Sequence, residues 1–415
     1  MLGRMEIWER RRKESDMLEK KHIILGVTGS IAAYKSAMLA SLLVKQGADV
    51  TAIMTKNGTN FINPITFETL TGNKCLVDTF DRNFEFQVEH VSLAAKTDLA
   101  IIAPATANFI GKMANGIADD MLTTTLLACR CPIIVAPAMN TRMYENAIVF
   151  DNLEKLRKYG FVVVEPASGK LACGDVGKGK MPEPDTLLEW ICHEIGHEKD
   201  MAGRKVLITS GPTREAIDPV RFITNHSTGK MGHALARSAS TRGAEVEFVT
   251  GRTEIDPPMF VNVVPVVSAG EMAKAVKDRA KDCDIVVCCA AVADFRPAKV
   301  ADEKLKKDGF ETNFVLEKTE DILSWVGENR FKGQQVVGFS METENVIENS
   351  RKKLEKKKCD MIVANNLRDE GAGFGTDTNV VTLITKDGAR RLPIMSKEEV
   401  ANESWDQLLA GISED

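Results

Sequence analysis

The amino-acid sequence predicts an α/β protein built from two doubly wound parallel sheets. Three observations lead to this prediction. Short apolar runs alternate with segments of helical periodicity, which is typical of parallel strands joined by crossover helices. The alternation breaks at a Met-Pro-Glu-Pro-Asp segment beginning at residue 181 and restarts near residue 205. The chain also has 415 residues, which is too long for one ordinary domain.

In the first half, five apolar runs are expected to be strands: 22–27, 49–54, 99–103, 133–136 and 161–165. We assign residues 21–190 to this first domain. Residues 1–20 are rich in charge, lack the apolar stretch of a secretory signal, and are expected to form a disordered extension. Residues 191–203, which end in a polar stretch, are expected to be a linker.

The second domain is expected to cover residues 204–415. Its predicted strands follow the same alternation with helical segments, and they are 205–209, 245–250, 261–267, 284–289, 336–339 and 361–364. Two further runs, 379–385 and 390–393, are joined across Lys-Asp-Gly and predict a C-terminal hairpin.

The composition excludes several classes of protein. Hydrophobic residues make up 44% and charged residues 27% of the chain, as in soluble globular proteins. A net charge of -5 gives no electrostatic reason to expect nucleic acid or an anionic membrane as a partner. No apolar run approaches the roughly 20 residues that span a bilayer. Nine cysteines without the spacing of a disulfide scaffold indicate a reducing, cytoplasmic location.

Small polar residues follow three of the expected strands in the first half. Gly29 and Ser30 lie in a turn that opens a helix, where free backbone N–H groups favour an anion. The spacing is not that of a dinucleotide fingerprint, so a mononucleotide phosphate fits better, although a tight turn without a ligand is the alternative. Thr106, Asn108 and Asn140 follow two further strands. Because ligands of open parallel sheets bind at the carboxyl ends of strands, these turns predict one crevice.

A glycine-rich run over residues 168–181 contains a single cysteine, Cys173. Glycine reaches backbone angles that other residues avoid, so such a loop can close over a ligand and bring a thiol to the chemistry. A flexible surface loop with an incidental thiol is the alternative interpretation. His90 precedes an expected helix, and a lone histidine is more often structural than catalytic.

Together, these motifs resemble the phosphopantothenoylcysteine decarboxylases over about residues 20–190. The resemblance implies a flavodoxin-like flavoprotein that uses FMN to convert 4'-phosphopantothenoyl-cysteine to 4'-phosphopantetheine. By position, His90 would be the base, Asn140 would hold the carboxylate or amide of the substrate, and Cys173 would be the proton donor of the reductive half. The same resemblance places FMN against Gly29, Ser30, Thr55, Thr106 and Asn108.

In the second half, a Ser-Gly-Pro-Thr segment follows the first strand, and an Asn-His-Ser-Thr-Gly-Lys-Met-Gly segment beginning at Asn225 opens a long helix. Its Gly-Lys pair is similar to a P-loop, but Met231 stands where Ser or Thr is required, so we reject that motif. Small residues at a helix start still suit a phosphate. The lysine run around Lys304 would ordinarily be a solvated face, unless a polyphosphate must be neutralised.

With Ala-Ala-Val-Ala-Asp-Phe, Val-Gly-Phe and Ala-Asn-Asn in the same order, this half resembles the phosphopantothenate–cysteine ligases over residues 202–410. The resemblance implies that CTP, with Mg²⁺, activates 4'-phosphopantothenate as an acyl-cytidylate that the amine of cysteine then attacks. Lys304 would stabilise charge as the acyl-cytidylate forms, and Asn225 would position that intermediate. The CTP contacts implied by position are Cys288, Cys289, Ala290, Asp294, Lys304, Glu320, Asp321, Ile322, Phe339, Lys353 and Lys357. No metal ligands are assigned.

The two resemblances identify a fused enzyme of coenzyme A biosynthesis, with small-molecule substrates and no nucleic-acid or membrane partner. They also imply a homo-oligomer, in which trimers of the first domain and dimers of the second give a dodecamer. A regulatory flavin-binding module is one alternative. A peptidyl-cysteine decarboxylase or a flavin prenyltransferase is another, which the attached ligase domain disfavours.

One further motif, from His193 to His197, matches the zinc-protease pattern His-Glu-x-x-His. It ends a short helix that Gly196 weakens, and no third ligand with a companion pattern follows. We therefore reject zinc catalysis.

Overall fold

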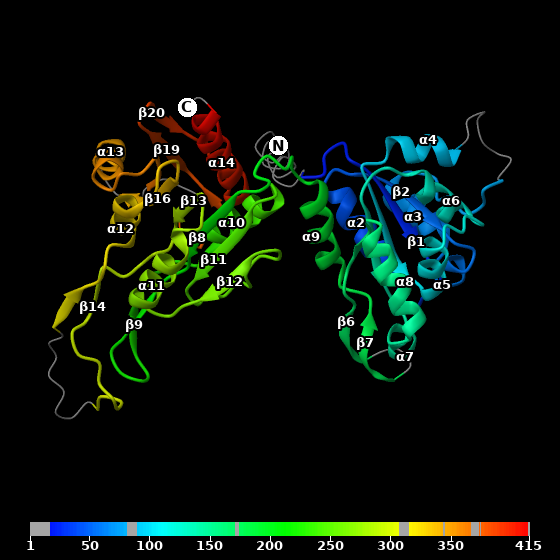
Figure 1. Ribbon diagram of the computed structural model, residues 1–415, viewed down its shortest axis with the longest axis horizontal. Helices are drawn as coiled ribbons and strands as arrows, with labels where there is room; N and C mark the ends of the chain where they lie inside the picture. Colours follow the sequence, from blue (N-terminus) through cyan, green and yellow to red (C-terminus); the bar gives the residue numbers. More distant parts are fainter. Residues whose placement is uncertain are drawn as a thin grey trace, which may run out of the picture. The chain divides into compact units, whose positions relative to one another are not determined.

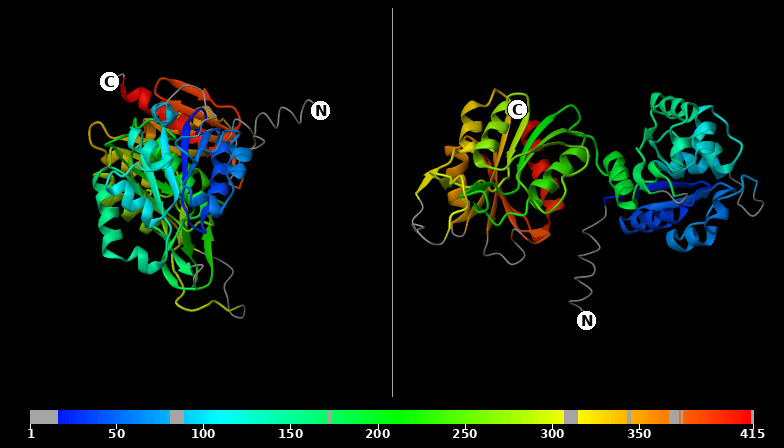
Figure 2. Two further views of the ribbon diagram at one scale, coloured as in Figure 1. Left: turned by 90° about the vertical axis from the view of Figure 1, so that its right-hand side faces the viewer. Right: turned by 90° about the horizontal axis from the view of Figure 1, so that it is seen from below.

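The computed structural model describes residues 17–80, 89–170, 174–306, 315–342, 345–366, 373 and 375–413 (Figure 1). It divides into two compact units between His197 and Glu198. Each unit is a mixed α/β structure with a central sheet that carries helices on both faces (Figures 1 and 2). This confirms the predicted fold class.

The sheet of the first unit has five parallel strands in the order β2-β1-β3-β4-β5. The strands are β1 (His22–Val27), β2 (Asp49–Met54), β3 (Leu99–Ala105), β4 (Ile133–Pro137) and β5 (Val162–Val163). The fifth is shorter than the sequence predicted, because only two of its residues pair with β4. The strand order reverses between β1 and β3, and this is where doubly wound sheets bind ligands.

Alternate side chains of these buried strands pack into two cores, one on each face. Ile23 and Leu25 face the core covered by α2 (Ala33–Lys45), α3 (Pro64–Thr71) and α9 (Pro184–Ile195). Ile24 faces the opposite core, covered by α4 (Glu89–Lys96), α5 (Ala107–Ala114), α6 (Met121–Ala128) and α8 (Ala147–Lys158). The remaining elements are η1 (Gly58–Asn60), α7 (Thr141–Tyr144) and a hairpin of β6 (Ala167–Lys170) and β7 (Val176–Lys180).

The second unit has an eight-stranded sheet in the order β12-β11-β8-β13-β16-β17-β19-β20. Its strands are β8 (Lys205–Ser210), β11 (Glu245–Thr250), β12 (Asn262–Pro265), β13 (Ile285–Cys288), β16 (Gln335–Glu342), β17 (Met361–Asn366), β19 (Val381–Thr385) and β20 (Gly388–Arg391). The first six in this order are parallel, whereas β19 and β20 are antiparallel. The predicted C-terminal hairpin is therefore the edge of this sheet, and the strand order reverses between β8 and β13.

One face of this sheet is covered by α10 (Lys230–Thr241) and α14 (Lys397–Ser413), where the buried Trp405 indole donates to the Leu235 carbonyl at 3.3 Å. The other face carries α11 (Ala269–Ala280), α12 (Ile322–Asn329) and α13 (Val346–Lys356). Three short pairs lie outside the sheet: β9 (Arg214–Ala216) with β10 (Phe222–Thr224), β14 (Phe295–Pro297) with β15 (Leu316–Lys318), and β18 (Thr378–Asn379) with β21 (Met395–Ser396).

The predicted boundaries differ from the structure at two places. Leu18, placed in the disordered extension, is fully buried in the first core, and its N–H donates to the Gln46 carbonyl at 3.2 Å. The predicted linker is divided between the units, because α9 continues to Ile195 and Met201 is fully buried in a core of the second unit. Both differences arise because Leu18 and Met201 are apolar residues within charged stretches of the sequence. Residues 1–16 lie outside the described residues. No helix in the described ranges is long and apolar enough to cross a membrane.

Candidate active sites

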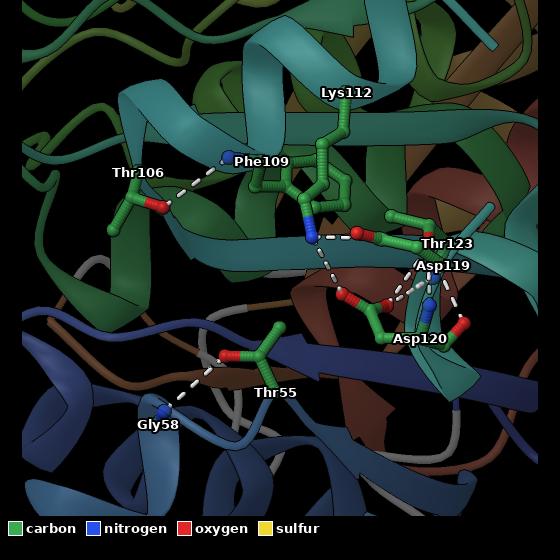
Figure 3. Close-up of polar contacts among 8 residues, drawn as sticks. All are labelled: Thr55, Gly58, Thr106, Phe109, Lys112, Asp119, Asp120 and Thr123. Atoms are coloured by element: carbon green, nitrogen blue, oxygen red, sulfur yellow. Dashed lines mark hydrogen bonds and ion pairs between the residues drawn. The ribbon is translucent and has the colours of Figure 1, made fainter. Parts of the chain in front are cut away.

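In the first unit, a buried threonine joins the loops that follow β1 and β3. The Thr28 hydroxyl donates to the Pro104 carbonyl at 2.7 Å and accepts from the Thr106 N–H at 3.1 Å. The Thr106 hydroxyl in turn accepts from the Phe109 N–H at 3.4 Å and caps α5 (Figure 3). The two loops are thus fixed together at the point where the strand order reverses. Thr28 was not predicted from the sequence, although it lies inside the predicted turn.

The loops after β1 and β2 also approach each other closely. A Cβ added at Gly29 would lie 2.7 Å from the Cβ of Asn57, and one added at Gly58 would lie 2.7 Å from the Val27 carbonyl oxygen. The Thr55 N–H donates to that carbonyl at 3.0 Å, and the Thr55 hydroxyl accepts from the Gly58 N–H at 3.2 Å (Figure 3). Only glycine therefore allows this backbone arrangement.

Four of the five residues predicted to hold FMN lie on these connected loops. Ser30 is half-buried, and its hydroxyl accepts from the Ala32 N–H at 3.3 Å. Gly29, Thr55 and Thr106 occupy the loops after β1, β2 and β3, and Asn108 lies exposed on the first turn of α5. The structure therefore gathers the predicted residues at the carboxyl ends of three adjacent strands.

A group of charged residues at the end of α5 and in the connection to α6 was not predicted from the sequence. The Lys112 ammonium lies 2.6 Å from the Asp119 carboxylate and 3.4 Å from that of Asp120 (Figure 3). Asp120 caps α6 by accepting from the Thr123 N–H at 2.9 Å. The hydrogen bond to Asp119 raises the pKa of Lys112. These contacts fix the connection between α5 and α6.

The glycine-rich run forms the β6–β7 hairpin, which packs on the loop after β4. The Met139 N–H donates to the Gly179 carbonyl at 3.0 Å. Gly179 has a φ of +137°, and a Cβ there would lie 2.3 Å from the Met139 carbonyl oxygen. The Asn140 amide donates to the Asp175 carboxylate at 2.8 Å, while its oxygen accepts from the Arg142 N–H at 2.8 Å. One end of the hairpin thus lies directly against Asn140.

The other two predicted catalytic residues of the first unit are Cys173 and His90. Cys173 lies outside the described residues, although Asp175, two residues further on, contacts Asn140. His90 is half-buried in the first turn of α4, which packs against α6. Within the described ranges, no hydrogen bond joins His90 to Asn140.

The second unit contains a cavity of about 540 Å³ at the carboxyl ends of β8, β13 and β16. All the predicted CTP residues except Cys289 and Lys304 line it, namely Cys288, Ala290, Asp294, Glu320, Asp321, Ile322, Phe339, Lys353 and Lys357. They come from four segments that are far apart in the sequence. The order of the strands, rather than any local motif, brings them to one place.

Hydrogen bonds position the lysines of this cavity. The Lys353 ammonium donates to the Phe339 carbonyl at 3.2 Å. The Lys357 ammonium donates to the Ser324 hydroxyl at 2.8 Å and forms an ion pair with Asp321. Burial alone would raise the pKa of Asp321, but the hydrogen bonds from Lys357 and the Ser324 N–H and the charges of Lys357 and Lys353 together lower it. Lys357 is thus partly neutralised, whereas Lys353 has no carboxylate partner among the described residues.

A second cavity, of about 310 Å³, shares a wall with the first and extends to the start of α10. The shared residues are Ala290, Val292, Asp294, Phe339 and Lys353. The far side is formed by Gly229, Lys230, Cys289, Asn365 and Lys397 among others. Free N–H groups at the start of α10 and two lysines make this end suited to an anion.

Two buried polar groups in this second cavity were not predicted. The Asn365 side-chain oxygen is buried and has no hydrogen-bond partner among the described residues. Lys397 is 6% exposed, its ammonium donates to the Gly373 carbonyl at 3.1 Å, and burial lowers its pKa. A buried lysine or an unpaired buried oxygen carries no distinctive sequence pattern, so only the three-dimensional arrangement finds them.

The small residues that open α10 have a packing reason. A Cβ at Gly229 would lie 2.5 Å from the Thr253 side chain, and one at Gly232 would lie 2.4 Å from the Ser210 hydroxyl. The two glycines therefore allow the start of α10 to approach β8 and the loop after β11. This close approach closes one end of the second cavity.

The two remaining predicted catalytic residues lie outside the cavity walls. Asn225 is exposed, and its amide donates to the carbonyls of Ala291 and Val292 at 3.0 and 3.3 Å. Since both of these residues line the second cavity, Asn225 lies at its rim. Lys304 is exposed and lines neither cavity in the described part of the chain.

The two adjacent thiols contact different cavities. Cys288 lines the larger cavity and Cys289 the smaller one. Burial raises the pKa of Cys288 far above its usual value and that of Cys289 to about 12. Both thiols are therefore protonated at neutral pH and would meet a bound molecule as small apolar groups rather than as nucleophiles.

Two α/β units, each with polar groups gathered where the strand order of a parallel sheet reverses, define a two-site enzyme of the doubly wound class. The family described as "Flavoprotein" matches residues 11–196, and the "DNA/pantothenate metabolism flavoprotein C-terminal domain" matches residues 201–412. The chain is 46% identical to the coenzyme A biosynthesis bifunctional protein CoaBC of Bacillus subtilis, over 95% of this chain and 98% of that protein. It is 40% identical to the protein of the same name from Escherichia coli, over 96% and 98%. The chain belongs to this family of coenzyme A biosynthesis bifunctional proteins.

Solved structures are similar to each unit separately. The C-terminal domain of a CoaBC protein is 43% identical, covers 52% of this chain and 98% of its own, and has a TM-score of 0.45. A PPC decarboxylase mutant in complex with pantothenoylaminoethenethiol is 30% identical, covers 42% of this chain and 97% of its own, and has a TM-score of 0.38.

Proposed function

We propose that the second unit joins 4'-phosphopantothenate to cysteine at the expense of CTP, and that the first unit decarboxylates the product with bound FMN. The observation that carries the proposal is the pair of adjoining cavities in the second unit. A ligase of this kind must hold a nucleotide and an acid side by side, and these two cavities share the wall that contains Lys353 and Asp294.

The larger cavity suits a nucleoside triphosphate. Lys318, Lys353 and Lys357 supply positive charge, and Phe339 supplies an apolar surface. Mg²⁺ bound to a triphosphate usually takes one or two protein carboxylates. Asp294 lines both cavities and makes no ion pair within the described ranges, so we propose it as the carboxylate that faces this ion.

The smaller cavity suits the phosphorylated acid. The start of α10 together with Lys230 and Lys397 would hold the phosphate group, and the unpaired Asn365 oxygen would accept a hydrogen bond from a hydroxyl or amide N–H. The substrate carboxylate would then lie at the shared wall and attack the α-phosphorus of CTP, which releases pyrophosphate. The amine of cysteine next attacks the acyl carbon, and CMP leaves. Lys304 and Asn225 keep the roles that the family resemblance gives them.

The first unit fits a flavin mononucleotide. Gly29 and Gly58 let the loops after β1 and β2 pack closely together, and the hydroxyls of Ser30, Thr55 and Thr106 lie on the same connected loops. FMN supplies the reversible electron acceptor that a saturated thiol substrate lacks. Asn140, held by Asp175, would orient the substrate carboxylate, His90 would act as the base and Cys173 as the proton donor.

Exposed apolar side chains on the first unit support self-assembly. Ile31, Tyr34 and Met38 are 61%, 57% and 54% exposed on one side of α2 and its preceding turn, and Phe61 and Ile65 are 49% and 59% exposed nearby in the fold. Grouped apolar exposure of this kind marks interaction surfaces. We propose that second copies of the chain cover this face in a cytoplasmic dodecamer. Sedimentation of the full chain tests this, because a monomeric protein would contradict it.

The ligase assignment is tested by pyrophosphate release from CTP. We expect release only when both CTP and 4'-phosphopantothenate are present, and we expect it before cysteine is added. Release that is independent of the acid would contradict the arrangement of the two cavities.

The flavin site yields a prediction for Gly58→Ala. The new Cβ would meet the Val27 carbonyl oxygen at 2.7 Å, so the loops after β1 and β2 must separate, and we expect the purified variant to lose most of its flavin absorbance. Gly111→Ala is the matched control, because its Cβ would make only an ordinary contact at 3.7 Å. If both variants retain flavin equally, these loops do not form the flavin site.

A further inference from the structure

The buried carboxylate of Asp218 lies in the turn between β9 and β10 and is 2% exposed. One of its oxygens accepts from the N–H groups of Val220 and Arg221, both at 2.8 Å. The other accepts from the Arg221 guanidinium at 2.5 and 2.9 Å and from the Leu305 N–H at 3.2 Å. Every contact made by this carboxylate therefore organises its own turn or reaches the segment that contains Lys304.

The turn holds that segment at both ends. The Arg221 guanidinium donates to the Leu305 carbonyl at 2.6 Å, next to Lys304. At the other end, the Ala301 N–H donates to the Ile217 carbonyl at 3.0 Å. The Lys304 side chain lies between these two attachments and is exposed. The backbone of residues 301–305 is therefore fastened to the turn, while the lysine itself projects toward solvent.

The β9–β10 hairpin also leads to the second catalytic residue of this unit. β10 ends at Thr224, whose hydroxyl donates to the Thr213 carbonyl at 2.7 Å, and Asn225 follows directly. The Arg214 guanidinium lies 4.7 Å from the centre of the Phe222 ring and stiffens the hairpin further. β14, which begins the chain segment leading to Lys304, lies beside β9 (Figure 1). One short hairpin thus connects Asn225 at its base to the Lys304 segment at its turn.

We infer that Asp218 is a positioning residue of the ligase site, which fixes the Lys304 segment relative to Asn225. This inference rests on the proposed function for the role of Lys304. Among the described residues, the Asp218 carboxylate forms no hydrogen bond with a residue that lines either cavity, so it acts only through the segment that it holds. Small displacements of a catalytic group can cost about 10²-fold in rate, which makes such a support measurable.

The test uses the full-length chain with Asp218→Asn, which keeps the shape of the side chain but turns an N–H donor toward Arg221 and Leu305. We expect the rate of acyl-cytidylate formation to fall by about 10-fold to 10²-fold, with little change in the KM for CTP. Lys304→Gln alone should cost about 10²–10³-fold. In the double variant, Asp218→Asn should cost almost nothing more. Multiplicative losses would overturn the inference, because they would show that Asp218 acts independently of Lys304.

Asp360→Asn is the matched control. The Asp360 carboxylate accepts from the Arg330 guanidinium at 2.5 Å and from the Val336 N–H at 2.7 Å. Like Asp218, it therefore joins an arginine to a backbone N–H, but elsewhere in the unit. We expect Asp360→Asn to change the ligation rate by the same factor whether Lys304 is present or replaced by Gln. If the effect of Asp360→Asn instead disappears in the Lys304→Gln background, as that of Asp218→Asn should, then Asp218 acts only through general stability and the inference fails.

A second readout separates failure of this inference from failure of the proposed function. Limited trypsin digestion should cut after Lys299, Lys304 or Lys306 faster in Asp218→Asn than in the unsubstituted chain or in Asp360→Asn. This comparison does not depend on any ligase activity. Equal cleavage rates would show that Asp218 does not hold the segment, whatever reaction the unit catalyses.

Discussion

Replacing Lys353 with alanine is expected to lower kcat/KM for CTP by about 10²–10³-fold, the cost of losing one preorganised charge at a reacting phosphate. Lys353 lines both cavities and is held by the Phe339 carbonyl at 3.2 Å. Its neighbour Lys357 is already paired with Asp321 and can compensate only in part. The loss should appear in pyrophosphate release from CTP and leave the decarboxylase reaction of the first unit unchanged.

Lys352→Ala is the control for this prediction, because it removes the same charge from the adjacent position of α13. The Lys352 ammonium lies on the exposed face, 2.7 Å from the Glu348 carboxylate, and lines neither cavity in the described part of the chain. We expect near-normal ligase activity from it. Equal losses in the two variants would mean that overall charge, rather than the position of Lys353, matters for CTP.

Gly179→Ala is expected to lower the decarboxylation rate by about 10²-fold and to leave ligation unchanged, because displacement of positioned groups carries a cost of that order. Gly179 has a φ of +137°, and its new Cβ would lie 2.3 Å from the Met139 carbonyl oxygen. The β6–β7 hairpin must then move off the loop that carries Asn140. This movement would break the 2.8 Å hydrogen bond from Asn140 to Asp175 and displace the segment that contains Cys173.

Gly160→Ala separates this effect from general backbone strain. Gly160 also has a positive φ, of +87°, but a Cβ there would meet nothing within 4 Å. Both variants should lose some stability, which thermal unfolding measures. Only Gly179→Ala should lose decarboxylation in the assay with 4'-phosphopantothenoyl-cysteine. Normal turnover by that variant would mean that the hairpin does not position the catalytic groups.

The sequence was sufficient for the fold class because the strands are buried and strongly apolar. The runs at 22–27 and 49–54 coincide with β1 and β2, whose side chains alternate between two cores. The boundaries were less predictable. Leu18 and Met201 lie in polar, charged stretches, and only tertiary packing shows that each belongs to a core.

The candidate sites were predictable where residues belong to a recognisable family motif. Nine of the eleven residues assigned to CTP by resemblance line one cavity, and four of the five assigned to FMN lie on connected loops, while their roles remain predictions. Thr28, Asn365 and Asp218 were missed. Thr28 and Asp218 form hydrogen bonds with distant parts of the chain, whereas the Asn365 side-chain oxygen has no partner among the described residues. No local spacing in the sequence encodes such contacts.

The most direct test of the account is to follow one reaction of the full-length chain by mass spectrometry, with 4'-phosphopantothenate, cysteine, CTP and Mg²⁺ supplied together. We expect 4'-phosphopantothenoyl-cysteine to form first and 4'-phosphopantetheine to replace it, with flavin bound throughout. A reaction that stops at the first product would contradict the assignment of the first unit. No CTP-dependent product at all would contradict the central claim that the adjoining cavities of the second unit form a ligase site.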